Sequence, residues 1–179
     1  MNPSVTEPGH ASASTEQHRA EAPKAVRCAV ITMSDTRTEA DDKSGRLIME
    51  ALASVGHETV IYRVVKDSPP AILAVLAEIA AEGGIRAILM NGGTGIASRD
   101  NTYETISGLL EKRMDGFGEI FRVLSFNEVG AASMLSRAVA GVWRGMVLFS
   151  MPGSVNAVRL PMDKLIVPEL AHVIRELNK

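Results

Sequence analysis

This chain of 179 residues has one cysteine, few aromatic residues and almost no excess charge, and each shortage excludes a class of protein. A single cysteine, Cys28, cannot form an internal disulfide or a cysteine-only metal site. It lies in an apolar run, so we interpret it as a buried small side chain rather than a reactive thiol. Aromatic residues make up 4%, too few for a surface that stacks nucleic-acid bases. The net charge of −2 gives no general attraction to nucleic acid or to an anionic membrane.

Long hydrophobic runs are also missing, and no segment has the length and apolar character of a membrane span. The first residues lack the basic and then apolar order of a secretory signal. We therefore expect a cytoplasmic protein that binds neither nucleic acid nor a membrane. Residues 1–24 hold hardly any large apolar side chain, which predicts a disordered N-terminal tail. Across the chain, 46% hydrophobic and 22% charged residues suit one folded domain, which we place at residues 25–179.

Short apolar runs alternate with stretches of helical periodicity throughout this domain. The apolar runs predict strands at residues 26–33, 59–65, 85–90, 138–143 and 146–150. Strand–helix alternation of this kind predicts an α/β three-layer sandwich, with a mainly parallel central sheet covered by helices on both faces. In such sheets the ligands bind beyond the carboxyl ends of the strands. That rule places four loops along one rim: residues 34–38, 66–70, 92–100 and 151–154.

The helical stretches have recognisable starts and stops. The first predicted helix has Asp42 or Ser44 as its N-cap, and the second follows Ser68 as N-cap, with a proline at its first position. Another helix is expected to begin at Thr102. The stretch 115–119, with two glycines, predicts a break before a short helix that carries Phe121, Leu124 and Phe126. Two prolines, at positions 161 and 168, are expected to break or kink the C-terminal helical region.

The most informative stretch is the glycine turn Gly92-Gly93-Thr94-Gly95, which follows an apolar strand and precedes a helix. A glycine-rich turn at this position leaves backbone N–H groups free, and the helix dipole adds positive potential, which suits a phosphate or a carboxylate. The turn is one residue short of the dinucleotide-binding fingerprint, and no Gly-Lys-Ser/Thr completes a P-loop. The sequence therefore predicts an anion site without the standard dehydrogenase or P-loop ATPase chemistry.

Two aspartates, Asp67 and Asp100, each follow the end of a predicted strand. Paired carboxylates on one rim suit a hard cation such as Mg2+, which commonly arrives with nucleotide phosphates. The alternative is that Asp67 is a turn or capping residue beside Ser68, and that Asp100 caps the helix at Thr102. The neighbouring glycine turn favours the metal-binding interpretation.

Nucleophilic catalysis by a protein side chain is not expected. None of the four histidines adjoins a rim loop, and the chain has no Gly-x-Ser-x-Gly elbow. Arg137, after Ser136, could bring a guanidinium to a phosphate. On the residues alone we favour a simpler interpretation, in which these two side chains are a surface pair near a helix end.

Six motifs occur in one order and together resemble the molybdenum cofactor biosynthesis family of the MoaB and MogA type, closer to MoaB. They are Ser34-Asp35-Thr36, Asp42-Lys43-Ser44-Gly45, Gly92–Gly95 with Arg99-Asp100, Gly116–Glu119, Leu135-Ser136-Arg137 and Met151-Pro152-Gly153-Ser154. The resemblance covers residues 25–179. It implies molybdopterin adenylyltransferase activity, in which Mg-ATP and molybdopterin give adenylyl-molybdopterin and pyrophosphate.

The resemblance also implies roles for particular residues and partners. Asp67 and Asp100 match the acidic positions associated with Mg2+ and catalysis. The nucleotide-contact loops match Gly92, Gly93, Thr94, Gly95, Pro152, Gly153 and Ser154, and the pterin pocket matches Ser34, Asp35, Ser136 and Arg137. A homo-oligomer is implied, either a trimer or a hexamer of two stacked trimers. Other proteins of cofactor biosynthesis are further candidate partners.

Three functions compete at this point. The first is the adenylyltransferase. The second is a non-catalytic member of the same family that binds molybdopterin or serves as a scaffold. The third is a nucleotide hydrolase, which would release product from ATP without any pterin.

Overall fold

The computed structural model describes residues 20–179 and arranges them around a six-stranded sheet with the strand order β2-β1-β3-β6-β5-β4. The strands are β1 (Arg27–Met33), β2 (Glu58–Val65), β3 (Ala87–Asn91), β4 (Lys112–Arg113), β5 (Val139–Trp143) and β6 (Met146–Met151). The first four in the sheet are parallel, whereas β5 and β4 add an antiparallel edge. The mainly parallel sheet is therefore confirmed. Most of the predicted tail, residues 1–19, lies outside the described residues.

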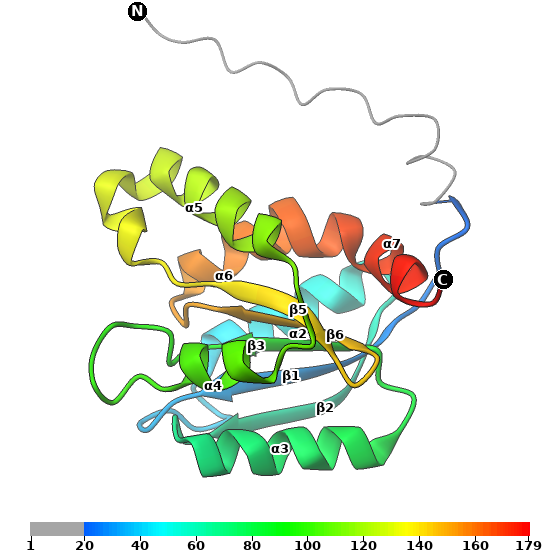
Figure 1. Ribbon diagram of the computed structural model, residues 1–179, viewed down its shortest axis with the longest axis horizontal. Helices are drawn as coiled ribbons and strands as arrows, with labels where there is room; N and C mark the ends of the chain where they lie inside the picture. The colour runs from blue at the N-terminus through cyan, green and yellow to red at the C-terminus, as the bar shows by residue number, and fades with distance from the viewer. Residues whose placement is uncertain (1–19) are drawn as a thin grey trace, which may run out of the picture.

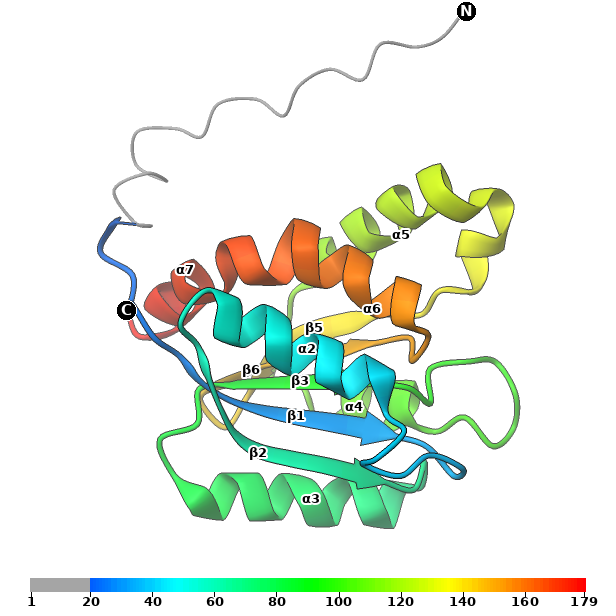
Figure 2. The same ribbon diagram turned by 180° about the vertical axis from the view of Figure 1, so that it is seen from behind.

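Helices cover both faces of the sheet and complete the predicted three layers (Figures 1 and 2). They are α2 (Lys43–Ser54), α3 (Pro69–Glu82), α4 (Thr102–Leu109), α5 (Asp115–Val129), α6 (Val155–Pro161) and α7 (Val167–Leu177), with a 3-10 helix η1 (Gly130–Leu135) and a π-helix η2 (Met162–Ile166). The helices α2, α5, α6 and α7 lie on one face, and α3 and α4 lie on the other. Within residues 20–179, no helix combines the length and the apolar character that crossing a membrane requires.

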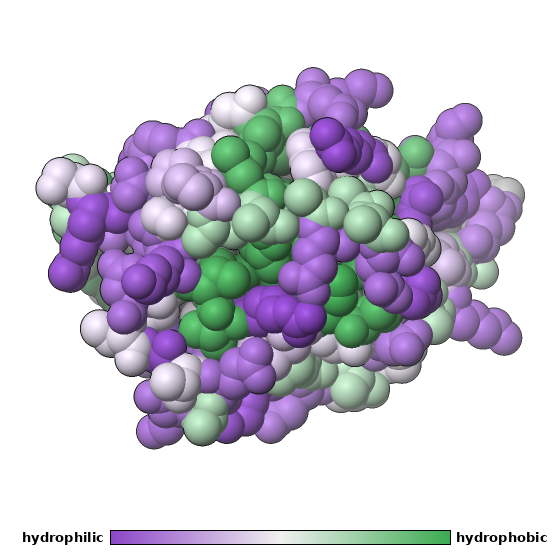
Figure 3. All heavy atoms as spheres, turned by 90° about the horizontal axis from the view of Figure 1, so that it is seen from below, coloured by the Kyte–Doolittle hydropathy of each residue, from purple (hydrophilic) through white to green (hydrophobic). Residues whose placement is uncertain are grey.

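The central strands are buried on both sides because alternate side chains enter two separate cores. Val30 and Leu89 pack toward α2 and α7, whereas Ile31 and Ile88 pack toward α3 and α4. The face that carries α3 has hydrophobic side chains showing between hydrophilic ones (Figure 3). Two-sided burial explains why the predicted strands appear in the sequence as continuous apolar runs.

Two of the predicted helix starts lie where the sequence places them, and only the first has a side-chain capping hydrogen bond. The carboxylate of Asp42 accepts a hydrogen bond from the N–H of Gly45 and caps α2. Helix α3 begins at Pro69, directly after Ser68. Both helices start at the carboxyl end of the sheet, so their first turns border the predicted rim.

The prediction of a break at residues 115–119, around Gly116 and Gly118, is wrong. This stretch is the first turn of α5, which runs unbroken for 15 residues from Asp115. Gly118 lies so close to the sheet that an added Cβ would be 2.7 Å from the carbonyl oxygen of Ala138. The glycine therefore serves helix–sheet packing, a role that looks like a helix stop in the sequence.

The C-terminal helical region is not interrupted at its prolines but changes its winding between them. Pro161 ends α6, the π-helix η2 follows, and Pro168 lies in the first turn of α7. A proline cannot donate the usual helical hydrogen bond, and in this chain a π-helix occupies the segment between the two prolines. The expected disturbance is therefore present, and it is local.

Candidate active site at the carboxyl rim

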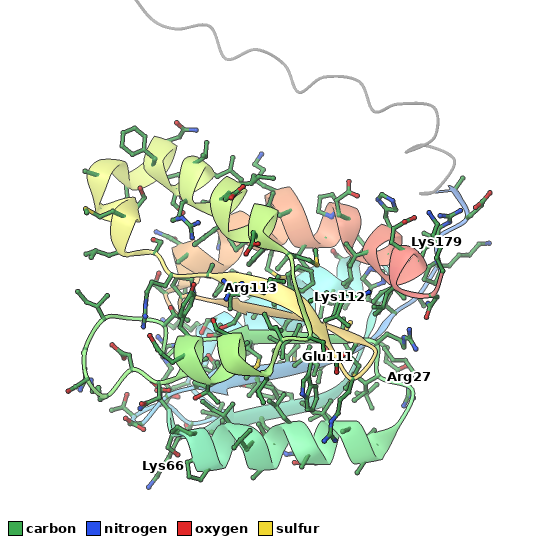
Figure 4. The ribbon with its side chains drawn as sticks, viewed as in Figure 1. Arg27, Lys66, Glu111, Lys112, Arg113 and Lys179 are labelled. Atoms are coloured by element: carbon green, nitrogen blue, oxygen red, sulfur yellow. The ribbon has the colours of Figure 1, made fainter. Side chains whose placement is uncertain are left out.

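The four predicted rim loops lie side by side at the carboxyl ends of β1, β2, β3 and β6. The N–H of Ser34 donates to the carbonyl of Val65 (2.8 Å), which joins the loops after β1 and β2. The N–H of Gly92 donates to the carbonyl of Met151 (3.0 Å), which joins the loops after β3 and β6. Lys66, at this end of β2, and Arg27, at the opposite end of the sheet, are both labelled in Figure 4. The parallel order of the strands thus brings together segments that are far apart in the sequence.

The glycine turn after β3 requires glycine at its first two positions. Gly92 and Gly93 have φ values of +97° and +63°, a region that L side chains rarely adopt. A Cβ on Gly92 would overlap the carbonyl oxygen of Met33, and a Cβ on Gly93 would overlap Thr102 and the carboxylate of Asp67. Among residues 20–179, no group accepts a hydrogen bond from the N–H groups of Gly93, Thr94 or Gly95. The turn thus has the free donors that an anion site needs.

Asp67 lies against the glycine turn and is tied to the start of α4. Its carboxylate accepts hydrogen bonds from the N–H of Asn101 (3.3 Å to each oxygen) and from the hydroxyl of Thr102 (2.9 Å). Burial raises the pKa of Asp67; these hydrogen bonds oppose the rise, and the charges of Asp100 and Asp35 add to it. Asp67 therefore does not cap the helix that follows it, whose N-cap is Ser68; it holds the N-cap residue and the first residue of α4 instead.

Asp100 closes the loop in front of α4 and does not cap that helix. Its Oδ2 accepts a hydrogen bond from the N–H of Ala97 (3.0 Å), and the N-cap position of α4 is Asn101. Asp67 and Asp100 both line one cavity of about 170 Å3. Its other lining residues are Met33, Ser34, Asp35, Thr36, Gly93 and Arg99. The two carboxylates predicted to share a site are therefore neighbours across one small cavity.

The donor set of this cavity suits a hard cation without being complete for one. No group of three or more His, Cys, Asp and Glu side chains that could hold a metal ion occurs within residues 20–179. Mg2+ is usually held by one or two carboxylates together with substrate phosphates and water. Asp67 and Asp100 fit that pattern, in which the phosphates would supply the remaining ligands.

A buried carboxylate, Asp42, organises the loops beside the cavity. One oxygen accepts hydrogen bonds from the hydroxyls of Thr32 (2.5 Å) and Tyr62 (2.9 Å), and the other accepts from the hydroxyl of Ser44 (2.8 Å) and the N–H of Gly45 (3.1 Å). Burial alone would raise the pKa of Asp42, but these four hydrogen bonds together lower it. The charged side chain thereby joins β1, β2 and the first turn of α2.

Arg37 connects two rim loops, and the sequence arguments did not single it out. Its guanidinium donates to the hydroxyl of Ser44 (2.9 Å) and to the carbonyl of Gly153 (3.0 Å). Gly153 lies against the glycine turn, since an added Cβ would be 2.9 Å from the Cα of Gly92. A positive charge within a predicted rim loop was the signal that could have identified Arg37. The loop after β6, which contains Gly153, ends with Ser154. The hydroxyl of Ser154 accepts a hydrogen bond from the N–H of Ala157 and caps α6.

Arg137 contacts the glycine turn and is not a simple surface residue. Its Nε donates to the carbonyl of Thr94 (2.9 Å), and one Nη donates to the carbonyl of Gly95. Its guanidinium is also paired with Glu104 and lies over the ring of Tyr103, 4.6 Å from the centroid. The interpretation as a surface pair is therefore wrong for Arg137. Ser136 has no side-chain contact of this kind with the turn among the described residues.

Comparison with known proteins identifies the family to which this arrangement belongs. Residues 29–172 match the family model described as "Probable molybdopterin binding domain". Molybdenum cofactor biosynthesis protein B of Halalkalibacterium halodurans is 56% identical over 167 residues, which cover 93% of this chain and 98% of that protein. The chain belongs to the molybdenum cofactor biosynthesis protein B family. The protein of the same name from Bacillus subtilis is 50% identical over 167 residues, with 93% and 98% covered.

Solved structures agree with membership in the molybdenum cofactor biosynthesis protein B family. A crystal structure of a molybdenum cofactor biosynthesis protein B has a TM-score of 0.84 and 49% identity, and covers 88% of this chain and 99% of that one. The tungsten cofactor synthesizing protein MoaB from Pyrococcus furiosus has a TM-score of 0.81 and 43% identity, with 88% and 100% covered. The resemblance drawn from six ordered motifs is confirmed, and the matched range 29–172 contains all of them.

Proposed function

We propose that this protein is a molybdopterin adenylyltransferase, which uses Mg-ATP to adenylylate molybdopterin and releases pyrophosphate. The observation that supports it best is the cavity that Asp67 and Asp100 line together with Gly93, a residue of the glycine turn whose N–H group is free. Carboxylates and free amides on one rim can hold a metal-bound polyphosphate. The chain also belongs to a family of molybdenum cofactor biosynthesis proteins.

The size of the cavity indicates which part of the nucleotide it would hold. Pockets that enclose a whole small ligand usually have about 300–1,000 Å3. The cavity of about 170 Å3 is smaller than this range, so it suits a phosphate group with its cation rather than a nucleoside. The nucleoside would then lie along the neighbouring loops, which include Pro152, Gly153 and Ser154.

The proposed reaction needs no nucleophile from the protein. An oxygen of the terminal phosphate of molybdopterin attacks the α-phosphorus of ATP; the new P–O bond forms as the bond to the β-phosphate breaks, and pyrophosphate leaves. Cys28, within β1, is fully buried, and burial raises the pKa of its thiol to about 12, so it stays protonated. The residues of the rim would act by positioning the two anions and by stabilising charge on the transferred phosphate.

Mg2+ would be held by Asp67 and Asp100, and it would supply positive charge against the phosphate oxygens. The N–H groups of Gly93, Thr94 and Gly95 would donate to the same group of oxygens. Ser34 and Asp35, which line the same cavity, are the residues we assign to the pterin.

A second function, that of a non-catalytic pterin-binding member, is favoured by one specific observation. Asp67 and Asp100 both have structural duties, because one holds the start of α4 and the other closes its own loop. If these hydrogen bonds were the only roles of the two carboxylates, both would also be present in a family member that catalyses no reaction. An activity assay therefore has to decide between the two functions.

The deciding experiment is to incubate the protein with Mg-ATP and molybdopterin and to measure pyrophosphate release. We expect release that depends on both substrates, and a loss of about 10²–10³-fold in turnover for Asp100→Asn. Asp163→Asn, an exposed change on η2, is the control and should leave turnover unchanged. Full activity of Asp100→Asn would contradict the assigned role, and binding of pterin without any release would favour the non-catalytic function. Release from ATP without pterin would indicate a hydrolase.

We propose further that the protein is a homo-oligomer and that α5 lies in the contact between subunits. Ile120, Val123, Phe126 and Val129 recur at every third position of α5, and each is at least half exposed. Met134 on η1 continues the stripe and is 79% exposed. An apolar surface of this extent is typical of an interface. Light scattering would distinguish a trimer from a hexamer. The cytoplasmic location and contacts with other proteins of cofactor biosynthesis stay predictions.

A further inference from the structure

The guanidinium of Arg137 is almost fully occupied by contacts within the protein. It donates to the carbonyls of Thr94 and Gly95 and makes two hydrogen bonds to the carboxylate of Glu104. These four contacts use four of the five N–H groups of a guanidinium. One face of the group is covered by the ring of Tyr103. Arg137 therefore has little capacity left to bind a substrate phosphate.

The contacts of Arg137 determine the direction of the glycine-turn amides. In a trans peptide group the N–H points away from the C=O. When Arg137 holds the carbonyls of Thr94 and Gly95, it fixes the direction of the N–H groups in the same two peptide groups, which are those of Gly95 and Ile96. The carbonyl of Gly93 is held in the same way by the N–H of Thr102 (3.1 Å). The carbonyls of three consecutive residues thus have donors within the protein. The N–H groups of the same three peptide groups point away from those donors.

Glu104 completes this arrangement from the first turn of α4. The Glu104 side chain is 59% exposed and the Arg137 side chain is 24% exposed, so Glu104 contacts the guanidinium from the solvent side while Arg137 contacts the turn. The pairing also restricts the rotamers of a long, flexible side chain. A charged donor on a carbonyl further polarises the peptide group and strengthens its N–H as a donor.

We propose that Arg137 and Glu104 form a clamp that positions the glycine turn for the phosphates of the nucleotide. In this arrangement Arg137 is a positioning residue for the nucleotide and not a ligand of the pterin, and Glu104 acts through Arg137. The proposal rests on the proposed function, because it concerns the nucleotide that the site would bind.

The test compares Arg137→Lys, Glu104→Gln and the double variant in calorimetric titrations with Mg-ATP and, separately, with molybdopterin. We expect Arg137→Lys to weaken Mg-ATP binding by about tenfold, because lysine cannot hold two carbonyls and a carboxylate at once. Glu104→Gln should weaken it less, and the double variant should be no weaker than Arg137→Lys, since both changes break one clamp. Molybdopterin affinity should stay within about twofold in all three. Arg63→Lys and Glu78→Gln, which alter another exposed ion pair, are matched controls.

Each other result contradicts the proposal. A loss of molybdopterin affinity with unchanged Mg-ATP affinity would make Arg137 a pterin ligand. Additive effects of the two changes would mean that Glu104 does not act through Arg137. Hydrogen exchange of the ligand-free protein separates the clamp from the proposed function. We expect the hydrogen-bonded amides of this turn and its loop, those of Gly92, Ala97 and Asp100, to exchange about tenfold faster in Arg137→Lys than in the wild type. Unchanged exchange would refute the clamp, whereas faster exchange in a protein that binds no Mg-ATP would refute only the proposed function.

Discussion

Replacing Asp42 with asparagine tests whether one buried charge holds the base of the rim together. The carboxylate is fully buried and accepts four hydrogen bonds, two at each oxygen, at 2.5–3.1 Å. Hydrogen bonds to a charged acceptor contribute about 1 kcal/mol more than those to a neutral one. Four of them give about 4 kcal/mol, and the lower cost of burying a neutral amide offsets part of this. We expect Asp42→Asn to lower the free energy of unfolding by about 2–3 kcal/mol at pH 7.

The dependence of this effect on pH follows from the direction of the pKa shift. The pKa of Asp42 is lowered in the folded protein, so its contribution to stability is complete above the pKa of an unfolded aspartate, about 3.9. The contribution is lost as the pH falls through the lower, folded pKa. The difference between the wild type and Asp42→Asn should therefore be largest near pH 7 and shrink below about pH 4.

Urea unfolding at fixed protein concentration, followed by circular dichroism at several pH values, measures this difference. Fixed concentration matters because assembly would add to the apparent stability. Asp163→Asn, on the surface, should change the stability by no more than about 0.5 kcal/mol and serves as the control. The reasoning is refuted if Asp42→Asn is as stable as the wild type at pH 7, or if the difference between them is the same at pH 7 and pH 3.

Four further predictions concern single side chains. Gly93→Ala should abolish Mg-ATP binding measured by calorimetry, because its Cβ would overlap Thr102 and Asp67; unchanged binding would contradict the assigned turn. Burial lowers the pKa of His57, so the stability that the neutral ring provides should fall as the pH drops below about 6.5, and His57→Gln should remove this dependence in urea unfolding. Phe126→Glu should reduce the mass seen by light scattering while the circular dichroism spectrum stays the same. The thiol of Cys28 should not react with a thiol reagent in the folded protein and should react in urea.

Much of the fold could be predicted because its signals are local. Burial on both faces makes the central strands continuous apolar runs, and Ser68-Pro69 marks the start of α3. The convergence of the rim loops followed from parallel topology alone. β4 could not be predicted, because Lys112 and Arg113 are exposed and carry no hydrophobic pattern. The start of α5 was missed because Gly118, which allows close packing on Ala138, looks like a helix stop in the sequence.

The site was less predictable than the fold, because its contacts join residues that are distant in the sequence. Position alone indicated that Asp67 and Asp100 share an edge, but not that Asp67 holds the N-cap residue of α4, Asn101, from 34 residues away. Arg137 bonds to the carbonyl of Thr94 across 43 residues, and no spacing or periodicity indicates such a pair. A pattern of residue types shows which side chains could bind an anion; only the three-dimensional arrangement shows that this guanidinium is already in use.

The rim loops hold one another through backbone and side-chain hydrogen bonds before any ligand is bound, through Ser34 with Val65, Gly92 with Met151, and Arg37 with Gly153. A ligand that enters such a site finds its partners in place and loses little of its binding energy to the conformational entropy of ordering them. The backbone of these loops should therefore move by no more than about 1 Å between the free and the loaded protein.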